Sequence, residues 1–81
     1  MEEKKYISKE KKAELEQELQ DLRTVKRKEV LDALEYAKSL GDLSENAEYH
    51  QAREDQGKLE ERIQKIEEIL KESIVAKKPS G

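Results

Sequence analysis

A single glycine divides most of this chain into two long segments that favour helix. From residue 9 to residue 40 there is no glycine or proline, and Gly41 is the first residue at which a helix is expected to end. Leu15, Leu19 and Leu22 are spaced by four and three residues, which places them on one helix face. The second segment has a seam with the same steps, formed by Ala52, Gln56, Leu59, Ile63, Ile66 and Leu70. Two helices that reverse near the glycine are therefore expected.

The composition suits a narrow seam between helices better than a broad core. Of the 81 residues 46% are charged, and there is no phenylalanine or tryptophan, so only one small domain is expected. The regular apolar spacing argues against the disorder that high charge alone would permit. We predict an all-α fold: a long antiparallel two-helix coiled-coil hairpin with an acidic tip. It forms one domain over residues 1–76, followed by a linker or frayed end over residues 77–81.

The boundaries of the helices follow from capping and breaking residues. Ser8 is the expected N-cap of a first helix of about 30 residues. The second helix is expected to begin between residues 42 and 48 and to end near Glu72, and residues 73–76 to be extended because Ile74 and Val75 are β-branched.

A tight reversal fixes which residues of the two helices face each other. Leu15, Leu19 and Leu22 would then face Leu70, Ile66 and Ile63 in that order. A wider cap would shift this register by several residues, so both registers stay open. Lys26 and Glu29 stand where a strict heptad requires apolar residues, so the middle of the first helix is expected to pack loosely. Gly57, inside the second helix, is a position where the other helix or a partner protein could approach closely.

Composition also bounds the compartment and the classes of partner. The chain has no cysteine, which indicates a reducing compartment, and no apolar run long enough to span a membrane. A cytoplasmic protein without a membrane partner is therefore expected. The mixed charges and a pI near 5.3 give no general nucleic-acid footprint. Residues 41–57 contain five carboxylates and one arginine, so the whole net charge of −3 originates in this block.

Two interpretations of this acidic block remain open. In the first, Gly41 closes one helix, and Asp42 with Glu45 forms a capping box that opens the next, which predicts no chemistry. In the second, the two carboxylates point outward and converge on one divalent cation. Two carboxylates are too few for a closed site, but Mg²⁺ often takes only one or two and completes its shell with water and phosphate oxygens. Any Mg²⁺ here would be shared with another site.

Other polar residues near the block also have two interpretations. Asn46 either satisfies backbone groups of the turn or contacts a partner. Tyr49 either packs against the hairpin end or contacts a partner. His50 is expected to pair with Glu54 one turn later, since no neighbouring nucleophile supports an acid–base role. A basic cluster in the first helix is expected to be a solvated face rather than a contact with a partner; it contains Arg23, Lys26, Arg27 and Lys28.

The stretch GDLSENAEYHQAREDQG at residues 41–57 closely resembles the tip motif of the bacterial Gre transcript-cleavage factors. YISKEKKAELEQELQDL at residues 6–22 is similar to the N-terminal signature of that family, and the spacing between the two stretches agrees. The resemblance covers residues 6 to about 76. It implies an antiparallel coiled coil that enters the secondary channel of RNA polymerase. It also implies a C-terminal FKBP-like domain beyond Gly81, so the chain is either an excised domain or a short relative.

The resemblance further implies roles for named residues. Asp42 and Glu45 match the carboxylates that help hold a second Mg²⁺ and a water at the polymerase active centre, which activates cleavage of the 3′ end of backtracked RNA. Lys38 and Arg53 match basic residues that contact the emerging RNA; the alternative is that both are solvated side chains in ion pairs. The implied function is a transcription elongation factor that is not an enzyme alone and holds no cofactor in isolation. The alternatives are a non-catalytic protein-interaction arm and a Gre-like inhibitor that occupies the same channel.

Overall fold

The first limb of the hairpin starts at the predicted cap. The computed structural model describes residues 5–75, and in it the Ser8 hydroxyl accepts a hydrogen bond of 3.0 Å from the backbone N–H of Lys11. This bond satisfies one of the free N–H groups of the first turn, and Glu10 in the same turn faces the positive end of the helix dipole. The limb contains α1 (Lys9–Asp21), a π-helical segment η1 (Leu22–Lys26) and α2 (Arg27–Ser39). The predicted first helix is therefore confirmed in position and length.

The π-helical segment explains the break in the apolar pattern. Leu15, Leu19 and Leu22 are repeated by Val30, Leu34 and Ala37 fifteen residues later, which is one residue more than two heptads. A π turn accommodates one extra residue, so the limb presents both sets to the other helix.

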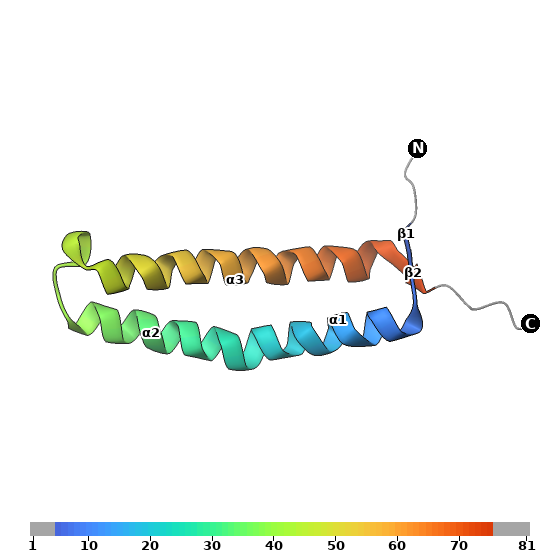
Figure 1. Ribbon diagram of the computed structural model, residues 1–81, viewed down its shortest axis with the longest axis horizontal. Helices are drawn as coiled ribbons and strands as arrows, with labels where there is room; N and C mark the ends of the chain where they lie inside the picture. The colour runs from blue at the N-terminus through green and yellow to red at the C-terminus, as the bar shows by residue number, and fades with distance from the viewer. Residues whose placement is uncertain (1–4, 76–81) are drawn as a thin grey trace, which may run out of the picture.

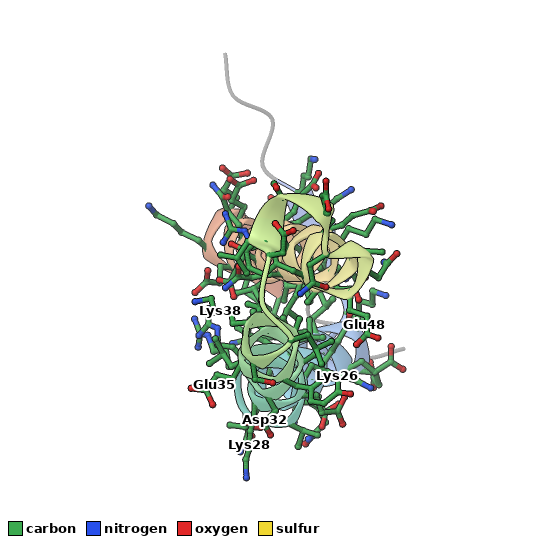
Figure 2. The ribbon with its side chains drawn as sticks, turned by 90° about the vertical axis from the view of Figure 1, so that its left-hand side faces the viewer. Lys26, Lys28, Asp32, Glu35, Lys38 and Glu48 are labelled. Carbon is green, nitrogen blue, oxygen red and sulfur yellow. The ribbon has the colours of Figure 1, made fainter. Side chains whose placement is uncertain are left out.

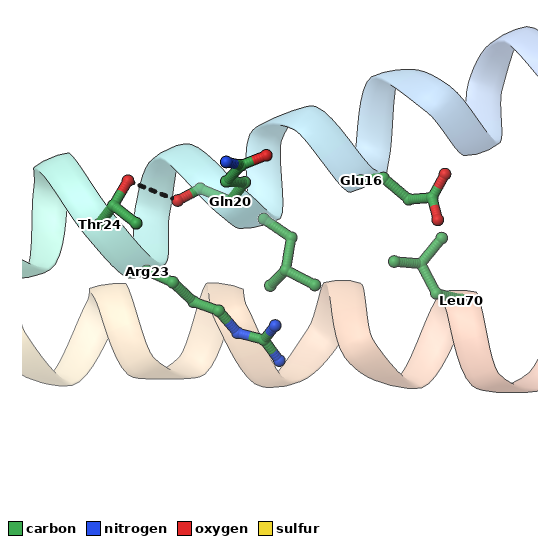
Figure 3. Close-up of a pocket in the computed structure, with 6 residues that line it drawn as sticks. Glu16, Gln20, Arg23, Thr24 and Leu70 are labelled. Atoms are coloured by element: carbon green, nitrogen blue, oxygen red, sulfur yellow. Dashed lines mark hydrogen bonds between the residues drawn. The ribbon is translucent and has the colours of Figure 1, made fainter.

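At this segment the Thr24 hydroxyl donates a 2.8 Å hydrogen bond to the carbonyl of Gln20 (Figure 3). Lys26 and Glu29 are exposed and form an ion pair instead of entering the seam. The interruption of the heptad pattern, from which loose packing was expected, therefore corresponds to a local change from α-helix to π-helix. Val25, Ala33 and Leu40 continue the apolar spacing of the first segment less strictly, but all three are exposed and lie outside the seam.

The second limb is a single helix, α3 (Ala47–Glu72), which lies antiparallel to the first (Figure 1). The seam residues Ala52, Leu59, Ile63 and Ile66 are buried, and Ile66 has no exposed surface. Leu15, Leu19, Leu59, Ile63 and Ile66 form the core cluster, with Leu22 and Leu70 packed against it. All six residues of the predicted pairing are therefore in one core, and the antiparallel hairpin is confirmed.

Ion pairs connect the two limbs on both sides of the π-helical segment. Arg62 donates two hydrogen bonds, of 2.8 and 3.0 Å, to Glu18, and Arg27 donates two, of 2.9 and 2.6 Å, to Glu60. These hydrogen bonds lower the pKa of each glutamate below its ordinary value. Arg23 reaches across toward α3 (Figure 3). There it forms an ion pair with Glu67.

The basic cluster of the first limb is therefore largely paired with carboxylates, as expected for a solvated face. Arg23 and Arg27 pair with α3, and Lys26 pairs within its own limb. Lys28 lies on the face of α2 that points away from α3 (Figure 2).

A short parallel strand pair closes the end of the hairpin opposite the turn. β1 (Lys5–Ile7) pairs with β2 (Ser73–Val75), with Tyr6 opposite Ile74 and Ile7 opposite Val75. Ile7 packs against the end of the core, whereas Tyr6 and Ile74 are exposed. The extended conformation predicted after Glu72 is confirmed for β2, and β1 adds a small strand to an otherwise helical fold. Residues 76–81, with the predicted domain boundary, lie outside the described residues.

Gly57 does not mediate close approach of the two helices. A Cβ added to Gly57 would meet no atom within 4 Å, and the residue is exposed on α3. The interpretation of a close helix–helix contact at Gly57 was therefore wrong, since the position faces open space. Within residues 5–75, no helix combines the length and the hydropathy needed to cross a membrane.

Candidate functional site

The turn at the far end of the hairpin contains two successive residues in left-handed backbone conformation. α2 ends at Ser39, and the N–H of Gly41 donates to the carbonyl of Lys38 at 3.1 Å. Gly41 has a φ of 82° and Asp42 a φ of 40°. Glycine adopts this region without penalty, and aspartate is one of the few other residues that enter it routinely. The predicted role of Gly41 as the residue that closes the first helix is confirmed.

A short 3₁₀ helix, η2 (Leu43–Glu45), follows Asp42 and projects from the end of the hairpin (Figure 1). The N–H of Glu45 donates to the carbonyl of Asp42 at 3.1 Å, and the N–H of Asn46 donates to that of Leu43 at 3.4 Å. The turn therefore has few hydrogen bonds of its own and depends on the side chains of Asn46 and His50, at the start of the second limb.

Asn46 supplies most of these side-chain bonds. Its Oδ1 accepts from the N–H of Tyr49 at 3.0 Å, so Asn46 is the N-cap of α3. Its Nδ2 donates to the carbonyl of Ala37 at 2.6 Å and to that of Gly41 at 3.2 Å. One half-buried side chain thus joins the end of α2, the turn and the start of α3. The interpretation that Asn46 satisfies turn backbone is confirmed; contact with RNA or polymerase stays a prediction.

The capping-box interpretation of Asp42 and Glu45 was wrong. Neither carboxylate of the pair caps a helix, because Asn46 occupies the N-cap position of α3. The carboxylate of Asp42 accepts a long hydrogen bond of 3.3 Å from the Ser44 hydroxyl. Among the residues that the structure describes, no backbone N–H donates to either carboxylate, and both residues are exposed. Asp42 and Glu45 are thus brought to the same turn with their oxygens available to an outside partner.

His50 takes part in the turn rather than in the predicted pair with Glu54. The ring Nε2–H donates to the carbonyl of Ser44 at 3.0 Å, while Glu54 pairs with Lys58. The expected His50–Glu54 contact was therefore wrong. A carbonyl six residues before His50 lies on another element, so helix periodicity alone could not identify it. The imidazole also meets the ring of Tyr49 edge to face, with centroids 5.8 Å apart.

Lys38 and Arg53 line one shallow groove beside the turn. Lys38 belongs to α2, whereas Tyr49 and Arg53 belong to α3. The groove has a volume of about 270 Å³, and its other lining residues are Leu31, Leu34, Glu35 and Gln56. Tyr49 is half-buried, which confirms that it packs against the hairpin end. Arg53 donates a 2.9 Å hydrogen bond to Gln56.

The charges on this flank of the tip are mixed. Lys38 and Glu35 lie on the same flank, and Glu48 lies on the opposite one (Figure 2). The two predicted basic residues are thus brought together, with one carboxylate beside them.

The described residues contain no group of three or more His, Asp or Glu side chains arranged to hold a metal ion. Asp42 and Glu45 nevertheless fit a shared site, because both offer hard carboxylate oxygens that no backbone amide of the described turn uses. Such a pair leaves most of the coordination shell of an ion to other donors.

The sequence of this chain is similar to those of known proteins over most of its length. Residues 5–75 match the family model GreA_GreB_N, described as "Transcription elongation factor, N-terminal". Transcription elongation factor GreA of Geobacillus kaustophilus is 47% identical over 74 residues, which cover 90% of this chain and 47% of that protein. GreA of Staphylococcus epidermidis is 49% identical over 61 residues, or 75% of this chain and 39% of that protein. GreA of Staphylococcus carnosus gives the same identity over 75% of this chain and 38% of its own length. The chain therefore spans less than half the length of these relatives.

Proposed function

Because this chain belongs to the family of Gre transcription elongation factor N-terminal domains, we propose that its tip enters an RNA polymerase and promotes cleavage of backtracked RNA. The proposed partner is the secondary channel of the polymerase, and the proposed substrate is the 3′ end of the nascent RNA. A slender hairpin of two helices that lie side by side, with the turn at its far end, suits insertion into a narrow channel (Figure 1). The site of action is the cytoplasm, where bacterial transcription takes place.

One observation carries the proposal. Asn46 caps α3, so the carboxylates of Asp42 and Glu45 are not needed as its N-cap. Carboxylates that are exposed and accept no backbone N–H from the described residues can bind what another protein supplies. A Mg²⁺ held mainly by the polymerase would polarise the scissile phosphate and make a bound water more acidic. Asp42 and Glu45 would contribute oxygens to that ion or accept hydrogen bonds from its water, which orients the water for attack.

The chain acts in this proposal only together with a polymerase. Two carboxylates at an exposed turn cannot position an RNA phosphate, and the attacking water has to be aligned with it. Lys38 and Arg53 would guide the RNA, because their groove lies beside the turn and both can bind phosphate oxygens. The carboxylate of Glu35 in the same groove limits the net positive charge, so contacts with a few phosphates are expected.

Shortening of radiolabelled RNA in a purified backtracked elongation complex tests this function. The chain is added over a wide concentration range, with Asp42→Asn, Glu45→Gln and Glu48→Gln compared with the unchanged chain. Each substitution removes one negative charge from the same end of the molecule. We expect the first two to lower the stimulated rate on the order of 100-fold, the scale seen when one electrostatic contact at a reacting centre is lost. Glu48→Gln is the matched control and should retain activity.

Binding measured on the same complexes separates the alternatives. Chain binding that slows cleavage would identify an inhibitor of the channel. Binding without any change of cleavage rate would identify an interaction arm. Equal activity of Asp42→Asn, Glu45→Gln and Glu48→Gln would refute the assigned role of the two carboxylates.

A further inference from the structure

The hydrogen bond between His50 and Ser44 joins the exposed 3₁₀ turn to the rigid second limb. Ser44 is followed directly by Glu45, and the Ser44 carbonyl belongs to the peptide group that ends in the Glu45 nitrogen. The Nε2–H of His50 donates to this carbonyl at 3.0 Å from the first turn of α3. The orientation of that peptide group is therefore linked to a helix rather than left to the turn alone.

The other bonds of the turn do not replace this link. The two backbone bonds of η2 lie within the turn, and the 3.4 Å bond from Asn46 to Leu43 is long. The Nδ2 of Asn46 holds the carbonyls of Ala37 and Gly41, which precede η2. Among residues 5–75, the side-chain hydrogen bond that links α3 to η2 comes from His50.

We propose that His50 is a positioning residue for Glu45, acting through the Ser44 carbonyl. The inference rests on the proposed function of Glu45 in RNA cleavage. A carboxylate that must meet an ion or a water held by another protein works only if its backbone is fixed before the encounter. Misplacement by about 1 Å at a reacting centre can cost on the order of 100-fold in rate. His50 itself does not need to touch RNA, water or metal.

Three substitutions distinguish this role from others. Gln places its amide nitrogen near the position of the imidazole Nε2 and can still donate to Ser44. Asn places its amide nitrogen near the position of the imidazole Nδ1, so its shorter side chain does not reach the Ser44 carbonyl. Ala removes the donor. Because His50 is exposed, each variant should fold, and far-UV circular dichroism checks this.

In the backtracked-complex assay, His50→Ala and His50→Asn should lower the maximal cleavage rate about tenfold, within the loss that misplacement can cause. The concentration that gives half-maximal stimulation should stay unchanged, because the docking surfaces are intact. His50→Gln should restore the rate to near that of the unchanged chain. An acid–base role would not be restored, since an amide does not titrate near neutral pH. Wild-type rates for His50→Ala where Glu45→Gln abolishes cleavage, or equally low rates for His50→Gln, would overturn the proposal.

A second measurement on the free chain makes the test independent of cleavage. The ¹⁵N order parameter of the Glu45 amide should fall from near 0.85 toward 0.6 in His50→Ala and recover in His50→Gln. If Glu45→Gln and His50→Ala both leave cleavage unchanged while this order parameter falls, the proposed function fails and the positioning contact stands. If Glu45→Gln abolishes cleavage and the order parameter does not change in His50→Ala, the positioning role fails and the proposed function stands.

Discussion

Replacement of Asn46 by alanine should be the most damaging change at the turn. The substitution removes the N-cap of α3, which typically costs about 1 kcal/mol. It also removes the donor to the carbonyls of Ala37 and Gly41, and a net hydrogen bond in a half-buried place contributes about 0.5–1.5 kcal/mol. We therefore expect the free energy of unfolding to fall by about 2 kcal/mol. For a domain of this size that corresponds to a decrease of roughly 8–16 °C in Tm.

Urea unfolding followed by circular dichroism measures this loss. The matched control is Asn46→Ser, because serine is an equally good N-cap but has no amide donor. It should recover about half of the lost stability, with an unchanged dependence of the free energy on urea concentration. If Asn46→Ala stays within about 0.5 kcal/mol of the unchanged chain, or if serine recovers nothing, the description of Asn46 as cap and clamp is refuted.

Two further predictions concern the helices. Gly57→Ala should stabilise the hairpin by about 1 kcal/mol, because the new methyl group meets open space, whereas Gly41→Ala should destabilise it, since φ there is 82°. Equal effects of the two substitutions in urea unfolding would contradict this. The lowered pKa values of Glu18 and Glu60 predict stability that is present above their unfolded pKa, near 4.5, and is lost as pH falls through the folded values. A double variant with glutamine at both positions should lose this part of the acid dependence, and an unchanged profile would refute the assignment.

The hairpin could be predicted from the sequence because its apolar residues repeat at helical spacing on both sides of Gly41. Leu19 and Ile66 lie in the predicted core for this reason. The π-helical segment follows from the same pattern, since the repeat is lengthened by one residue, but the sequence does not say where that residue is accommodated. In the structure the extra residue is accommodated in η1, which contains Thr24, and the Thr24 hydroxyl donates to the carbonyl of Gln20.

The turn was less predictable, because its residues compete for the same backbone groups. Asp42 with Glu45 has the spacing of a capping box, and Asn46 is an equally good cap four residues later. The bond from Asn46 to Ala37 decides between them, and it joins residues nine positions apart on different limbs. The bond from His50 to Ser44 likewise depends on where η2 lies relative to α3. Local spacing describes a helix well, but it does not describe contacts across a reversal of the chain.

The parallel pairing of β1 with β2 determines how the molecule responds when its two ends are pulled apart. In this arrangement a force applied ahead of Lys5 and beyond Val75 acts along both strands in opposite directions. All hydrogen bonds of the pair then bear the load together, as in shear, instead of separating one after another as in a zipper. The helices carry little tension until the pair ruptures, so tension on a tether at this end would leave the geometry of Asp42 and Glu45 undisturbed.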